Sequence, residues 1–204
     1  MALRDLWVVS APEQELLSSV VSRLVLWVIP SGVYLVATRG RDWAQPLGLG
    51  FPLGPTQLYR TIILTVMVTW ALFAATATRN GLGIFDELHL FSSSAQPRFT
   101  APLFEELLFR GVILSELLNW THKYSRSAWD LRARFLAAQF FSAAFFVCIH
   151  WPSWWGNLDF GAVVDRSIPV FAVGAVLGFV FAHTRSIWPC IWLHWLNNEL
   201  SLMP

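Results

Sequence analysis

Long apolar stretches run through this chain, separated by short polar or Gly/Pro-rich segments. A helix that crosses a bilayer needs about 20 mostly apolar residues. Several stretches have about that length, and the last, at the C-terminal end, is shorter; they lie at 16–38, 61–78, 100–120, 135–155, 167–184 and 186–198. We therefore expect an all-α fold, a polytopic bundle of about six transmembrane helices.

Composition supports a membrane protein and excludes several other classes. Of the 204 residues, 55% are hydrophobic and only 13% are charged, whereas a soluble domain carries roughly 25% charged residues. A disordered chain is excluded by the same numbers. The net charge of +1 gives no field to hold nucleic acid. We expect one integral membrane domain over residues 1–204, with a motif-bearing core at about 100–200, and the lipid bilayer as its surroundings.

The stretch at 100–120 is unusual because it combines the background of a spanning helix with several charges. It contains Glu105, Glu106, Arg110 and Glu116, and each charge near the centre of a bilayer costs about 2.5–3.5 kcal/mol on insertion scales. Residues four apart share a helix face, so Glu106 and Arg110 can pair. Glu105 points elsewhere and lacks that partner. Function should be sought in this segment.

Two further polar groups lie in apolar helices. One is Phe146-x-x-x-His150, and the other is His194-x-x-x-Asn198 with Asn197 beside it. Taken singly, such residues commonly serve as hydrogen bonds between helices in lipid. Because an unpaired polar group in hydrocarbon costs several kcal/mol, we expect these groups and the free carboxylate to meet around a hydrated pocket within the membrane, a polar intramembrane active site.

This set of groups is sufficient for peptide hydrolysis. A carboxylate and an imidazole can hold and deprotonate a water molecule and later deliver the proton to a leaving amine. An imidazole and a carboxamide can donate hydrogen bonds to the oxygen of a tetrahedral intermediate. No serine or cysteine is placed as an activated nucleophile, since Cys148 points away from His150. Direct attack by water is the simpler interpretation.

At these residues the sequence resembles a known family. The segments EELLFRG (105–111), FVCIH (146–150) and HWLNN (194–198) are similar, in order, to the three motifs of the CPBP (CAAX protease and bacteriocin-processing, Abi) intramembrane proteases, which include the type II CAAX prenyl endopeptidases. The resemblance covers about half of the chain. It implies three functional pairs: Glu105 with His150 to activate water, Glu106 with Arg110 as support, and His194 with Asn198 to stabilise the oxyanion.

The resemblance also implies a substrate and a location. We expect a glutamic-type endopeptidase that cleaves a membrane-associated protein or peptide, by CAAX-type, anchor or leader processing, in the inner (plasma) membrane of a bacterium or archaeon. We expect no cofactor; zinc held by Glu105, His150 and His194 is the alternative, although the zincin motif HExxH is absent. Two other functions remain open, a non-catalytic membrane immunity or scaffold protein and a proton-coupled transporter. The sequence does not determine the oligomeric state.

Overall fold

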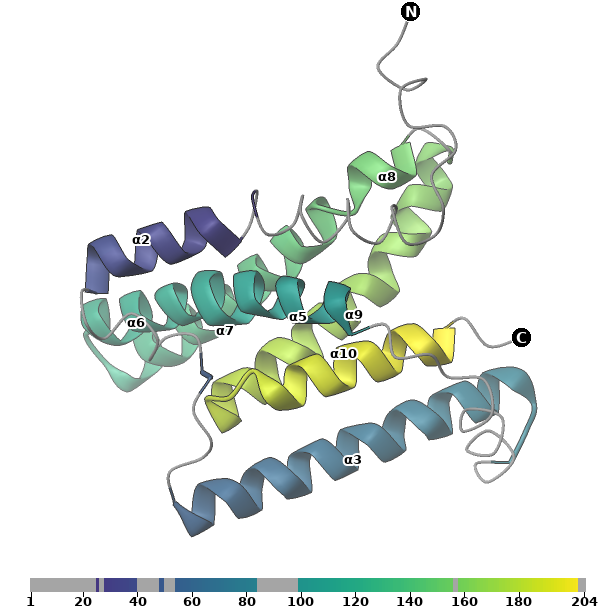
Figure 1. Ribbon diagram of the computed structural model, residues 1–204, viewed down its shortest axis with the longest axis horizontal. Coiled ribbons are helices and arrows are strands. Elements are labelled where there is room, and N and C mark those ends of the chain that lie inside the picture. Colours follow the sequence, from purple (N-terminus) through teal and green to yellow (C-terminus); the bar gives the residue numbers. More distant parts are fainter. Residues whose placement is uncertain are drawn as a thin grey trace, which may run out of the picture.

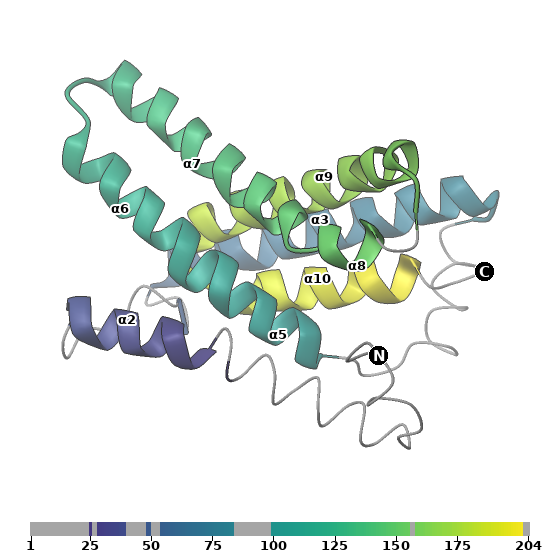
Figure 2. The same cartoon turned by 90° about the horizontal axis from the view of Figure 1, so that it is seen from above.

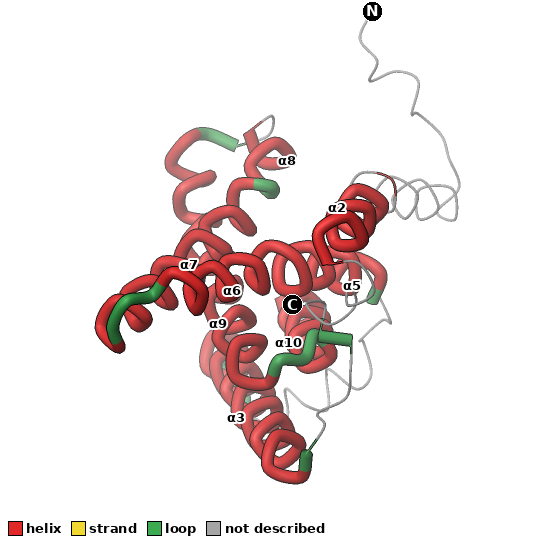
Figure 3. The backbone as a smooth tube through the Cα atoms, turned by 90° about the vertical axis from the view of Figure 1, so that its left-hand side faces the viewer, coloured by secondary structure: helices red, strands yellow, loops and turns green. Residues whose placement is uncertain are grey.

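The computed structural model describes residues 25, 28–39, 48–49, 54–83, 99–155 and 158–201, and every regular element in these ranges is a helix (Figure 3). Three helical stretches are long and apolar enough to cross a membrane: α3 (Pro55–Asn80), α9 (Phe160–Thr184) and the run Ala128–Trp155. The prediction of an all-α polytopic membrane protein is confirmed. Of the first predicted stretch, the structure describes the end as α2 (Ile29–Arg39), and the remainder lies largely outside the described residues.

The charged stretch predicted at 100–120 is one continuous helical run with an unexpected middle. It consists of α5 (Thr100–Glu106), a π-helix η4 (Leu107–Leu114) and α6 (Ser115–Tyr124). Wide π turns inside α-helices occur frequently at functional sites. Here the π-helix begins immediately after Glu106 and contains Arg110, so the change in helical geometry falls within the charged motif.

The stretch predicted at 135–155 starts earlier and is divided in two. α7 covers Ala128–Cys148 and the short α8 covers Trp151–Trp155. Pro152 lacks the backbone N–H that would continue the helical hydrogen bonding to the carbonyl of Cys148. The break puts His150 in the turn between the two helices.

Helices α7 and α9 make the most extensive contact among the described helices. Two glycines one turn apart on α9 form this contact: Gly174 lies against Ala143 and Phe146, and Gly178 lies against Gln139. Small residues allow helices in a membrane to approach closely. This packing fixes the C-terminal part of α7, which precedes His150, against the middle of the bundle.

The remaining helices lie on either side of this pair. α10 (Trp188–Ser201) packs on α9 and α3, and runs beside α3 (Figure 1). On the other side, α2 lies along η4 and α6 (Figure 2), where Leu35 is buried against Val112. Arg39 closes the end of this contact with a two-oxygen ion pair to Glu116, in which Nη2 lies 2.7 and 2.8 Å from the two carboxylate oxygens.

Candidate active site

The carboxylate of Glu105 and two imidazoles meet in the interior of the bundle. Oε2 of Glu105 lies 3.6 Å from Nε2 of His194 and 4.0 Å from Nε2 of His150. The three side chains come from α5, from α10 and from the turn after α7. Glu105 and His194 are buried and His150 is partly exposed. The structure thus brings together side chains that the sequence placed on three separate segments.

Glu106 is fully buried and binds two partners through one oxygen. Its Oε1 accepts a hydrogen bond from Nη1 of Arg110 at 3.0 Å and contacts Nδ1 of His194 at 2.8 Å. The pair with Arg110 is the one expected from the four-residue spacing. The sequence did not predict the contact with His194, which lies 88 positions away. A buried carboxylate needs several hydrogen-bond donors, but the sequence does not show which residues supply them.

Arg110 connects the charged helix to its neighbours. Besides Glu106, its guanidinium donates from Nη2 to the backbone carbonyl of Gly174 at 2.9 Å. The guanidinium carbon also lies 4.8 Å from the ring centre of Phe146, within the range of a cation–π contact. Arg110 has no exposed surface, so water does not solvate its charge and these contacts must compensate for it.

The ring of Phe146 contacts both imidazoles that face Glu105. It meets the rings of His150 and His194 edge-on, with centroids 5.1 and 5.5 Å apart, and packs edge-on against Phe109 at 5.1 Å. Its backbone carbonyl lies 2.8 Å from Nδ1 of His150. Phe146 therefore holds His194 through a ring contact, and holds His150 through a ring contact and a hydrogen bond to its carbonyl.

These hydrogen bonds set which ring nitrogens face Glu105. A carbonyl oxygen and an ionised carboxylate only accept hydrogen bonds, so Nδ1 of His150 and Nδ1 of His194 carry hydrogens. In a neutral ring the other nitrogen, Nε2, is then an acceptor. Two acceptor nitrogens and a carboxylate cannot satisfy one another, so this arrangement calls for a hydrogen donor between them, such as a water molecule or a further proton.

The two asparagines of the third motif lie beside this group on α10. Both are partly buried. Asn198 follows His194 by one turn and shares its face, whereas Asn197 is turned to one side. Within the part of the chain that the structure describes, the side chain of Asn198 makes no hydrogen bond to the carboxylates or imidazoles. Its placement is given by the helical repeat, and its role stays a prediction.

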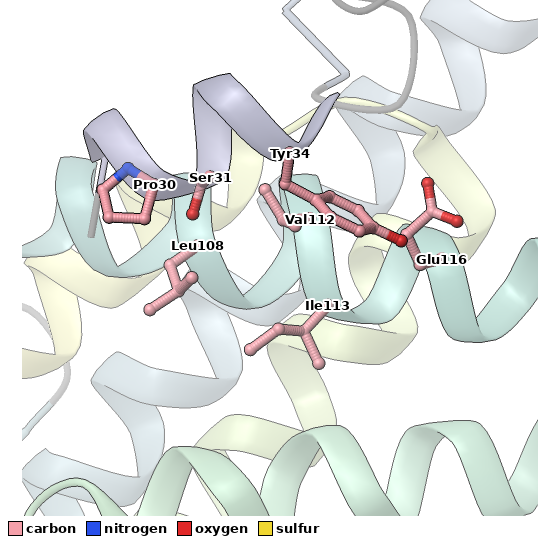
Figure 4. Close-up of a pocket in the computed structure, with 7 residues that line it drawn as sticks. All are labelled: Pro30, Ser31, Tyr34, Leu108, Val112, Ile113 and Glu116. Carbon is pink, nitrogen blue, oxygen red and sulfur yellow. The ribbon is translucent and has the colours of Figure 1, made fainter. Parts of the chain in front are cut away.

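A mostly apolar groove runs along the helical run formed by η4 and α6. It lies between α2 and the η4–α6 run, has a volume of about 410 Å³ and is lined by Pro30, Ser31, Tyr34, Leu108, Val112, Ile113 and Glu116 (Figure 4). Leu108 is one turn beyond Glu105, and Glu116 closes the other end with Arg39.

Apolar spanning helices around a buried cluster of carboxylates and imidazoles are the arrangement expected of an intramembrane hydrolase. A family model, described as Type II CAAX prenyl endopeptidase Rce1-like, matches residues 87–200. The chain belongs to this family and is a CAAX-type intramembrane protease that acts on a membrane-associated protein substrate. All three motifs lie within the matched residues. Comparison with curated proteins and with solved structures finds no match.

Proposed function

We propose that the nucleophile is a water molecule held between Glu105 and His150. The observation that supports this is the convergence of the Glu105 carboxylate with the Nε2 atoms of two imidazoles whose Nδ1 atoms are already bonded elsewhere. A water placed there can donate one hydrogen to the carboxylate and one to His150. Loss of cleavage on replacing Glu105 tests the proposal.

The proposed reaction proceeds by transfer of one proton. Glu105 takes a proton from the water as its oxygen attacks the carbonyl carbon of the scissile peptide bond, forming a tetrahedral intermediate with an oxyanion. Glu105 then gives the proton to the departing amine as the C–N bond breaks. Reuse of one group as base and then acid is typical of general acid–base catalysis, which contributes about 10²–10⁴-fold.

Stabilisation of the oxyanion is assigned to His194 and Asn198. Nδ1 of His194 already binds Glu106, so Nε2 can donate to the oxyanion only when the imidazole carries both protons. In that form His194, Glu106, Arg110 and ionised Glu105 have no net charge, which lowers the cost of burying them. Glu106 thereby both pairs with Arg110 and orients the imidazole of His194 through its contact with Nδ1.

We expect the reaction to proceed without a metal ion. Zinc would use the same three atoms, Oε2 of Glu105 and the two Nε2 atoms, and the bonds made by each Nδ1 fit a zinc-binding histidine. Prolonged treatment with a chelator should leave cleavage within about twofold of the untreated rate, with less than one zinc per chain by metal analysis. Loss of activity that only zinc restores would contradict the water mechanism.

We propose that the groove between α2 and η4 holds the isoprenoid chain of a prenylated substrate. Its lining is mostly apolar, its volume falls in the range of small-molecule sites, and one lining residue, Leu108, follows Glu105 by three positions on the same helical run. A prenyl chain attached next to the scissile bond could lie in the groove while the peptide bond reaches the carboxylate. The family description, a CAAX prenyl endopeptidase, supports this occupant.

Filling the groove should selectively weaken the binding of prenylated substrates. We expect Ile113→Trp to raise KM for a farnesylated CAAX peptide about tenfold, corresponding to about 1.4 kcal/mol, because the indole occupies the space of the chain. KM for the same peptide without the farnesyl group should not change. Leu136→Trp, on the exposed face of α7, is the control. An equal rise for both peptides would exclude the groove as the prenyl site.

The finer location is also a proposal. We place the protein in the inner (plasma) membrane of a bacterium or archaeon, because its three motifs are similar to those of the CPBP proteases. Fractionation of cells that express the chain would test this.

A further inference from the structure

His150 is the least enclosed member of the group around Glu105. Its side chain is 28% exposed, compared with 9% for Glu105 and 5% for His194. It also lies in a turn and not within a helix. Phe146 holds the imidazole through a ring contact and through the bond from Nδ1 to its carbonyl. Because this side chain is more exposed than the other two, a second contact is needed if Nε2 is to stay near Glu105.

Trp154 provides that support. Its ring lies 5.6 Å from the imidazole of His150 between centroids, at an interplanar angle of 34°, and its side chain is partly buried. The imidazole therefore contacts two rings, that of Phe146 four positions before it and that of Trp154 four positions after it.

The short helix α8 that carries Trp154 is itself fixed. Ser153 donates to the backbone carbonyl of His150 from its amide at 3.2 Å and from its hydroxyl at 2.7 Å. Nε1 of Trp151 donates to the hydroxyl of Ser167 on α9 at 3.1 Å. Pro152 restricts the backbone between them. These contacts tie α8 to the turn and to the neighbouring helix, so Trp154 is held where it meets the imidazole.

We propose that Trp154 is a positioning residue that keeps Nε2 of His150 directed at the water beside Glu105. The inference rests on the proposed function, in which His150 accepts a hydrogen from that water. Without the indole, rotation about the His150 side-chain bonds would let the imidazole move outward. A misplacement of about 1 Å can cost a catalytic reaction about 100-fold, although the peptide would still bind.

The test compares Trp154→Ala with Trp155→Ala. Trp155 belongs to the same helix but is 59% exposed, and its ring contacts Trp151 and Phe160. We expect W154A to lower kcat for a CAAX peptide at least about tenfold with KM within about twofold, because only the reacting geometry is lost. W154F should recover most of kcat, and W155A should remain near the wild-type rate.

Two further measurements separate positioning from binding and folding. Affinity for an uncleaved peptide is compared between Glu105→Gln alone and Glu105→Gln combined with W154A, and we expect no difference. Thermal unfolding of W154A in detergent should match that of W155A; if W154A does not fold, W154L is measured in its place. An unchanged kcat, a parallel loss of peptide affinity, or equal loss in W155A would overturn the inference.

The outcome also distinguishes this inference from the proposed function. If E105Q is inactive while W154A cleaves at the full rate, the role of Trp154 is wrong and the water mechanism is unaffected. If E105Q itself cleaves normally, the water mechanism fails whatever W154A does.

Discussion

Replacing Glu105 by Gln is expected to lower peptide cleavage by about 10³-fold or more, the upper part of the range for loss of a general base. Gln has nearly the shape of Glu and can occupy the same place beside His194 and His150, at the 3.6 and 4.0 Å distances seen for the carboxylate. It cannot take a proton from water. The measurement is the rate of release of the C-terminal fragment from a CAAX peptide by the purified protein in detergent.

The folded yield and unfolding temperature of this variant should stay close to those of the wild type. Glu105 faces two imidazoles at 3.6 and 4.0 Å, which can be neutral, whereas Glu106 faces a guanidinium that stays charged, so removing the charge of Glu105 leaves no permanent charge unpaired. Glu105→Ala should be equally inactive, and Asp165→Asn, a carboxylate exposed on α9, should cleave normally. Substantial cleavage by either Glu105 variant would remove this residue from the mechanism.

The same experiment bears on the two alternative functions. A scaffold or immunity protein would show no cleavage even as the wild type, and replacing Glu105 would leave its partner binding intact. A proton-coupled transporter would move protons across liposomes, and this flux would stop in the Glu105 variants. Cleavage by the wild type that disappears in E105Q, without any such flux, supports the protease mechanism alone.

The sequence was sufficient to predict most of the helices and the side chains that lie together in the candidate site. Apolar stretches long enough for a bilayer mark the helices directly, and polar residues inside them are rare because they are costly in lipid. Glu105, His150 and His194 could therefore be selected without knowing how the helices pack. The pairing of Glu106 with Arg110 followed from helical geometry alone.

Helix interruptions and long-range contacts were not predictable in the same way. Residues 107–114 are apolar almost throughout, so they show no periodicity that would distinguish a π-helix from an α-helix. The apolar stretch near Pro152 likewise continues across the break after Cys148. The bond from His194 to Glu106 depends on how α10 packs against α5, and that of Arg110 on the close approach of Gly174. Such contacts between distant segments leave no periodic signal.

The second large effect is expected from Arg110→Ala. Removing one member of a fully buried ion pair costs about 3–5 kcal/mol, because the remaining charge stays buried without its partner. Here the loss leaves Glu106 with His194 only, and it also removes the donor to the Gly174 carbonyl. We expect little folded protein, and a clearly lower unfolding temperature in what can be purified.

The matched comparison is Asn198→Ala, which changes another residue of the motifs. Asn198 is only partly buried and carries no charge, so its loss should reduce kcat through weaker stabilisation of the oxyanion while the yield stays near that of the wild type.

Adding Glu106→Gln to Arg110→Ala should recover part of the lost stability, because it removes the unpaired charge. That recovery identifies the buried charge, and not the lost volume of the side chain, as the cause. Normal yield and unfolding of Arg110→Ala would show that the ion pair does not stabilise the fold.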